Sequence, residues 1–143
     1  MTNEIKVGIT GCAGRMGRAL MLQVAEHERC ALSGGSEHAD SEAIGLDLGE
    51  LAGLGTLGLT VSRDTRLVFE TADVVLDFTS PSATAHHAEI AAATGTAWVA
   101  GTTGLAPKQE AAIVEAASKT AIVRAANMSV GVNLLLALTE QVA

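Results

Sequence analysis

Two patterns of apolar and polar positions alternate along the chain. Short, apolar, β-branched runs are typical of buried strands, and segments in which apolar residues recur every three or four positions are typical of helices. We predict strands at residues 5–10, 30–37, 59–62, 72–79, 96–100 and 120–127. We predict helices at residues 16–27, 81–94, 106–118 and 132–143, and a long loop at 45–58, which holds five glycines.

The order of these elements predicts the fold class. Strands that alternate with helical crossovers form a parallel sheet with helices on both faces. We therefore expect an α/β fold, a Rossmann-like, doubly wound parallel sheet in a single domain. Ser80 is the expected N-cap of the helix that starts at Pro81, because proline is well tolerated at the first helical position.

Composition and charge restrict the class of partner. The 143 residues are 48% hydrophobic and carry a formal net charge of −7, with no basic cluster. An acidic chain repels the phosphates of nucleic acids, and no apolar run approaches the ~18 residues that a membrane-spanning helix needs. Cys12 and Cys30 are too few for a disulfide framework, and no spacing suggests a metal site. We expect a cytoplasmic protein that binds neither nucleic acid nor membrane.

The segment "GITGCAGRMGR" places glycines at Gly11, Gly14 and Gly17, between a predicted strand and a predicted helix. Glycines at this spacing allow a tight turn, close approach of a pyrophosphate and close packing of the helix. On spacing alone, an ordinary turn explains them equally well. Glu37 lies 20 residues after Gly17, where an acidic residue binds the adenosine ribose of a dinucleotide, and this favours a dinucleotide site.

Other polar segments follow predicted strands, at the edge where parallel sheets bind ligands. "GTTG" (101–104) and "AANMSVGVN" (125–133) are equally consistent with a binding role and with a turn or helix cap. A cap is the better interpretation of "DFTSP" (77–81). For His86 and His87 a packing or surface role is favoured, and for Cys12 that of a small filler.

Together, "GITGCAGRMGR", "GLDLGELAG", "VVLDFTSP", "VAGTTG" and "RAANMSVGVN" resemble the 4-hydroxy-tetrahydrodipicolinate reductase (dihydrodipicolinate reductase) family of diaminopimelate and lysine biosynthesis. The resemblance covers essentially the whole chain. It implies an oxidoreductase that uses NADH or NADPH to reduce a cyclic dicarboxylate.

The resemblance also implies which residues bind the cofactor. Glu37 would bind the adenosine ribose. His38 stands where many relatives carry an arginine for the 2′-phosphate of NADPH, and histidine is shorter and only partly charged near pH 7, so the choice between NADH and NADPH stays open. The glycine turn, Gly11, Cys12, Ala13, Gly14, Arg15, Met16 and Gly17, would hold the pyrophosphate. Gly101, Thr102, Thr103, Ala125, Ala126, Asn127 and Met128 would surround the nicotinamide, with Thr103 next to the substrate.

The domain organisation follows from the same resemblance. Residues 1–129 are expected to form the dinucleotide-binding domain, and residues 130–143 the start of a helix that leads to a substrate domain beyond this chain. In the family that domain supplies the catalytic residues and builds a homotetramer, so we expect no catalytic residue and little turnover from these residues alone. The alternatives are the cofactor domain of another NAD(P)-dependent dehydrogenase and a nucleotide- or CoA-binding module without catalysis.

Overall fold

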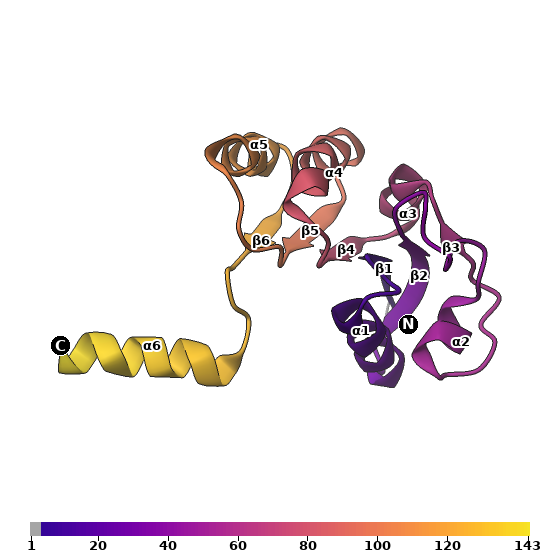
Figure 1. Ribbon diagram of the computed structural model, residues 1–143, viewed down its shortest axis with the longest axis horizontal. Helices are drawn as coiled ribbons and strands as arrows, with labels where there is room; N and C mark the ends of the chain where they lie inside the picture. Colours follow the sequence, from indigo (N-terminus) through magenta and orange to yellow (C-terminus); the bar gives the residue numbers. More distant parts are fainter. Residues whose placement is uncertain (1–3) are drawn as a thin grey trace.

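The computed structural model describes residues 4–143, and its centre is one six-stranded parallel sheet (Figure 1). The strands lie in the order β3-β2-β1-β4-β5-β6. They are β1 (Ile5–Thr10), β2 (Cys30–Ser36), β3 (Val61–Ser62), β4 (Val74–Asp77), β5 (Ala97–Ala100) and β6 (Ile122–Arg124). The predicted α/β, doubly wound parallel sheet is confirmed.

The chain reverses its direction across the sheet at β1. It first runs outward through β2 to β3, and then returns to place β4 on the other side of β1, so that Val7 pairs with both Leu32 and Val74. In such sheets the crevice at the carboxyl ends of the strands, at the point of reversal, is where ligands bind. The loops after β1 and β4 lie at this point.

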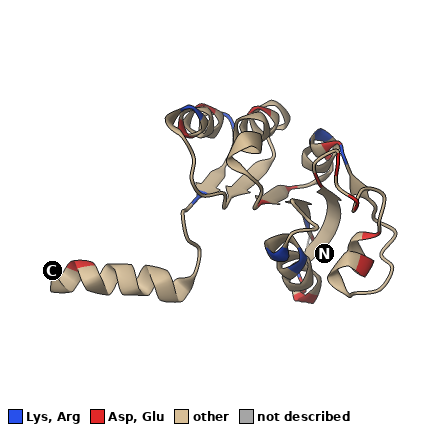
Figure 2. Ribbon diagram, in the orientation of Figure 1, with Lys and Arg blue, Asp and Glu red and all other residues tan. Residues whose placement is uncertain are grey.

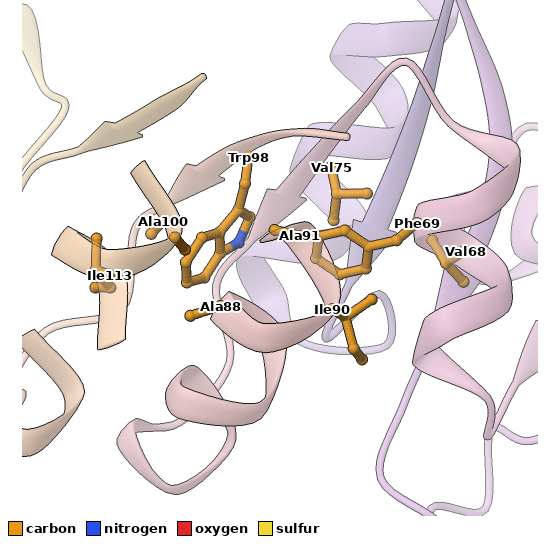
Figure 3. Packing of buried hydrophobic residues seen from close by; sticks show 10 residues of the cluster. Val68, Phe69, Val75, Ala88, Ile90, Ala91, Trp98, Ala100 and Ile113 are labelled. Carbon is orange, nitrogen blue, oxygen red and sulfur yellow. The ribbon is translucent and has the colours of Figure 1, made fainter. Parts of the chain in front are cut away.

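Helices cover both faces of the sheet (Figure 1). They are α1 (Arg15–Glu26), α2 (Leu48–Ala52), α3 (Thr65–Thr71), α4 (Pro81–Thr94), α5 (Pro107–Ala117) and α6 (Val130–Val142). Helices α1 and α2 pack on one face, where Ile9, Met21 and Leu48 are buried. Helices α3, α4 and α5 cover the other face, and Figure 3 shows Phe69, Ile90 and Trp98 in its core.

The prediction of an unbroken loop over 45–58 is wrong, because α2 forms within it. The Asp47 carboxylate caps this helix by accepting hydrogen bonds from the N–H groups of Gly49 at 2.8 Å and Glu50 at 3.3 Å. Gly53 ends it with φ of 77°, in the left-handed region. Of the five glycines that suggested a loop, Gly49 therefore lies within a short, capped helix and Gly53 ends it.

Helix α3 was not predicted at all. It is only seven residues long, and the Asp64 side chain caps it by accepting from the N–H groups of Arg66 and Leu67. Two of its residues, Val68 and Phe69, are buried against the sheet. Such a short helix gives too little periodicity to be recognised among its polar neighbours.

Helix α6 extends away from the sheet, and no residue in it is buried (Figure 1). Val130 is 84% exposed and Leu135 is 64% exposed. Glu140 is the charged residue in the sequence of this helix, and Figure 2 shows the rest of the helix almost free of acidic and basic colour. Among residues 4–143, no helix combines the length and apolar character that a membrane crossing requires.

Candidate functional site

The glycine turn between β1 and α1 is held against the end of β2. Gly11 has φ of 71°, which glycine adopts without strain. The N–H groups of Gly11 and Cys12 both donate to the carbonyl of Ser36, at 2.9 and 3.3 Å. The N–H of Gly14 donates to the carbonyl of Gly11 at 3.1 Å. These bonds fix the turn at the carboxyl edge of the sheet.

Gly17 lets α1 start directly against this turn. A Cβ at this position would lie 2.2 Å from the carbonyl oxygen of Gly11 and 2.6 Å from Cα of Cys12. Both atoms belong to the backbone, so no side-chain movement could relieve the contact. The third glycine of the motif therefore has the packing role that its spacing predicts.

Glu37 contacts the turn, although it lies 24 residues from Ala13 in the sequence. Its Oε1 accepts a hydrogen bond from the Ala13 N–H at 2.9 Å, while the Arg18 Nε donates to the Ala13 carbonyl at 3.0 Å. Both backbone polar groups of Ala13 are thus held by side chains from outside the turn. The spacing argument that paired Glu37 with the glycine turn agrees with this geometry.

The start of α1 suits an anion. The first N–H groups of any helix lack intrahelical acceptors, and the helix dipole makes this end positive. The first turn of α1 contains no acidic side chain, and its N-cap, Gly14, has no side chain to compete for these donors. Arg15, the first residue of the helix, is exposed beside them.

Cys12 is buried inside the turn and packs into the core on the α1 face. Burial, and then the nearby Glu37 carboxylate, raise the pKa of its thiol to about 12. The reactive thiolate is therefore scarce at neutral pH. This position fits the predicted role of a small filler and argues against a nucleophile.

We therefore expect only one of the two cysteines to react with a thiol reagent in the folded chain at pH 8. Cys30 is half-buried at the start of β2, whereas Cys12 is both covered and protonated. Absorbance after addition of Ellman's reagent should show one thiol per native chain and two in urea. The Cys30→Ser variant is the control, and rapid labelling of its native form would contradict the assignment.

A cleft of about 470 Å³ opens beside the glycine turn. We call it the Glu37 cleft. Predicted residues Gly11, Gly14, Glu37 and His38 line it. The remaining lining residues are Thr10, Ser36, Ala39, Arg63, Asp64, Thr65, Arg66, Phe78, Thr79, Ser80, Ala83, His86 and His87.

A second cleft, also of about 470 Å³, lies on the other side of Phe78. We call it the Met128 cleft. It brings together residues that are far apart in the sequence: Met16, Phe78, Gly101, Ala125, Ala126, Asn127, Met128 and Ser129. Phe78 lines both clefts and lies against Gly101, where a Cβ would come within 2.2 Å of its ring.

The two threonines of the "GTTG" segment differ in their exposure to solvent. Thr102 is buried, and its hydroxyl has no hydrogen-bond partner among the described residues, whereas Thr103 is exposed. Neither threonine lines the two clefts, although the neighbouring Gly101 does.

The ends of α4 and α6 are also organised by polar side chains. Ser80 stands at the N-cap position of α4 as predicted, but its hydroxyl contacts that of Ser82 and does not cap the helix. Ser129 does cap α6, since its Oγ accepts from the Val132 N–H at 3.4 Å. The Asn127 Oδ1 accepts from the Ser129 N–H at 2.8 Å, which fixes the backbone of the Met128 cleft.

Asp77 has a role that the sequence did not reveal, because we interpreted its segment as a helix cap. Its buried carboxylate at the end of β4 lies 2.7 Å from the His87 Nδ1 and accepts from the Trp98 Nε1 at 3.2 Å. Its other oxygen accepts from the hydroxyl of Thr79 at 2.7 Å. The methyl group of Thr79 in turn lies next to Gly11. The buried network around Asp77 therefore packs directly against the glycine turn.

The pKa of Asp77 reflects this network. Burial alone would raise it, but the hydrogen bond and the charge of His87, and the hydrogen bond from Thr79, outweigh burial and lower the pKa below its usual value of 3.8. Since an ionised carboxylate only accepts hydrogen bonds, the Nδ1 of His87 carries the proton between them. His87 therefore has the predicted packing role.

Arg63 was missed because it follows a two-residue strand and precedes the unpredicted helix α3. A recognisable signal was present: Asp64 is a good N-cap residue and stands before the apolar pair Leu67 and Val68. The strand predicted at 59–62 already placed Arg63 at the carboxyl edge of the sheet, and recognising this helix would have marked it as the junction between a strand and a helix.

Comparisons with known proteins agree with this geometry. A family model described as dihydrodipicolinate reductase, N-terminus, matches residues 5–128. The 4-hydroxy-tetrahydrodipicolinate reductase of Rhizobium meliloti is 43% identical over 141 residues, which cover 99% of this chain and 58% of the relative. The reductase of that name from Acinetobacter baumannii is 44% identical over 140 residues, which cover 98% of this chain and 51% of the relative.

A solved structure of a reductase from this family is also similar to part of this chain's fold. The dipicolinate-bound dihydrodipicolinate reductase from Paenisporosarcina sp. TG-14 superposes with a TM-score of 0.71 at 25% identity, over 90% of this chain and 49% of that one. The chain spans about half the length of the curated relatives it matches. It therefore belongs to the dihydrodipicolinate reductase family, whose amino-terminal part it matches.

Proposed function

We propose that this chain binds NADH or NADPH across the Glu37 cleft and the Met128 cleft. The observation that carries the proposal is the contact of Glu37 with the Ala13 N–H at the glycine turn. This contact holds a carboxylate beside an anion-binding helix end, so that ribose hydroxyls and a pyrophosphate can be bound side by side. The pyrophosphate would lie over the turn and the first residues of α1.

The residues present fit such a group. Gly17 leaves no room for a side chain between α1 and the turn, and the first turn of α1 has no acidic group that would compete with phosphates. Phe78, Gly101 and Met128 give the Met128 cleft apolar walls that suit a nicotinamide ring.

For the intact protein, we propose reduction of 4-hydroxy-tetrahydrodipicolinate to tetrahydrodipicolinate with loss of water, because the relatives carry that name. The bound cofactor supplies the hydride, which is chemistry of the nicotinamide and not of the protein. This chain's part is to bind the cofactor and orient its ring. Thr103, exposed next to Gly101, is the residue that we place beside the substrate.

The Glu37→Gln variant tests the cofactor site. The amide oxygen can still accept from the Ala13 N–H, but the charge that strengthens hydrogen bonds to ribose hydroxyls is gone. Such charge-assisted bonds contribute about 1.5–3 kcal/mol each, so we expect the Kd for NADH to rise about tenfold or more. Isothermal titration calorimetry measures this directly.

Glu28→Gln is the matched control, because Glu28 is exposed in the turn before β2, at the opposite edge of the sheet. Its Kd should equal that of the unmodified chain. Equal affinities in all three proteins would show that Glu37 does not bind the cofactor. Tight binding of CoA without binding of NADH or NADPH would instead support the alternative of a CoA-binding module.

A further inference from the structure

The register of the sheet places Arg63 beside Glu37. Strands β2 and β3 are parallel, with Ser36 paired to Ser62, and the N–H of Glu37 donates to the carbonyl of Ser62 at 3.0 Å. The next residue of each strand is Glu37 in β2 and Arg63 in β3. The two side chains therefore start from neighbouring positions at the carboxyl edge, and both line the Glu37 cleft.

Most of the other charges in this cleft are already engaged. Seven charged or titratable side chains line it: Glu37, His38, Arg63, Asp64, Arg66, His86 and His87. His87 is bound to Asp77 at 2.7 Å. Asp64 accepts from the N–H groups at the start of α3, and Arg66 donates to Glu70 at 2.8 Å. Glu37 is bound to the turn. Among the described residues, Arg63 has neither an ion pair nor a side-chain hydrogen bond.

We infer that Arg63 binds the phosphate on the 2′-hydroxyl of the adenosine ribose, and that the chain prefers NADPH to NADH. The inference rests on the proposed function, which puts that ribose at Glu37. A group attached to the ribose next to Glu37 lies within reach of the neighbouring strand end. The guanidinium offers a planar, permanently charged pair of donors that matches a phosphate.

His38 has a secondary part in this site. It follows Glu37 directly and lines the same cleft, but its ring is shorter than an arginine side chain. Arg63, on the adjacent strand end, supplies the longer and permanently charged side chain of the two.

The test compares two pairs of ligands by isothermal titration calorimetry: NADPH with NADH, and 2′-phospho-ADP-ribose with ADP-ribose. The unmodified chain should bind the phosphorylated member of each pair about tenfold more tightly, as expected for a charge-assisted contact. In Arg63→Gln most of this preference should vanish, while the Kd for NADH and ADP-ribose changes less than about twofold. Added salt should reduce the preference of the unmodified chain.

Arg29→Gln is the matched control, because it removes the same charge from an exposed turn before β2, at the opposite edge of the sheet, and lines neither cleft. It should keep the preference. Equal affinity of the unmodified chain for both members of each pair would overturn the inference alone, as would a preference that survives in Arg63→Gln or is lost equally in Arg29→Gln. Absence of binding by all four ligands would overturn the proposed function, and the inference with it.

Discussion

Replacing Gly17 with alanine should destabilise the fold by about 3 kcal/mol or more, the upper range for overpacking a rigid site. The added Cβ would lie 2.2 Å from the Gly11 carbonyl oxygen and 2.6 Å from Cα of Cys12. Because the turn is held to β2 by the bonds to Ser36, it can retreat only by breaking them. Urea unfolding followed by circular dichroism measures the loss.

Gly34→Ala is the control for this prediction. Gly34 lies in β2, and a Cβ there would have its nearest neighbours at 3.8 Å, which is ordinary contact. We expect a change in unfolding free energy of less than about 1 kcal/mol in either direction. Equal stabilities of the two variants would mean that the glycine turn moves freely. The conclusion that its hydrogen bonds to Ser36 hold it in place would then be wrong.

Replacing Asp77 with alanine should cost about 3 kcal/mol or more of unfolding free energy, because each buried polar group left without its hydrogen-bond partner costs about 1–3 kcal/mol. The variant leaves His87, Trp98 and Thr79 without their common acceptor. Trp98 is the only tryptophan of the chain, so its fluorescence reports on this change directly. Asp40→Ala, at an exposed loop position, is the control and should be nearly neutral.

The pH dependence gives the Asp77 prediction a second readout. Because folding lowers the pKa of Asp77 below 3.8, the folded state favours the ionised form. This contribution to stability is fully present above pH 3.8, and it is lost as the pH falls through the lower value of the folded state. The stability gap between the unmodified chain and Asp77→Ala should therefore narrow on acidification below about pH 4. A gap that stays constant between pH 7 and pH 3 would contradict this account.

Local patterns in the sequence were enough to predict most of the fold. The alternation of short apolar runs with helical periodicity predicted all six strands and four of the six helices, because those elements bury enough apolar residues to leave a pattern. Helices α2 and α3 depend on the single capping residues Asp47 and Asp64. Their short lengths, five and seven residues, leave no periodic signal.

Residues of the candidate site were predictable only where they belong to one short motif or lie at a characteristic distance from it along the sequence. Glu37 was found from its distance to the glycine turn. The structural role of Asp77 and the proposed role of Arg63 were not found, because both depend on pairings between strands: β4 with β5, and Ser36 with Ser62. The pattern of residue types along the chain predicts where the strands are, but it does not predict their order in the sheet.

The order of the strands also bears on how the chain is made. During synthesis β1 emerges first, yet it lies in the middle of the finished sheet, and its partner β4 ends only at Asp77. The Lys6 N–H, just before the β4 pairing begins, bonds to Asp73, 67 residues away. Until β4 has left the ribosome, one side of the first strand offers unpaired N–H and C=O groups to other chains. A nascent chain that has not yet released β4 therefore carries an open strand edge at β1, and this edge closes only when the second half of the sheet pairs with it.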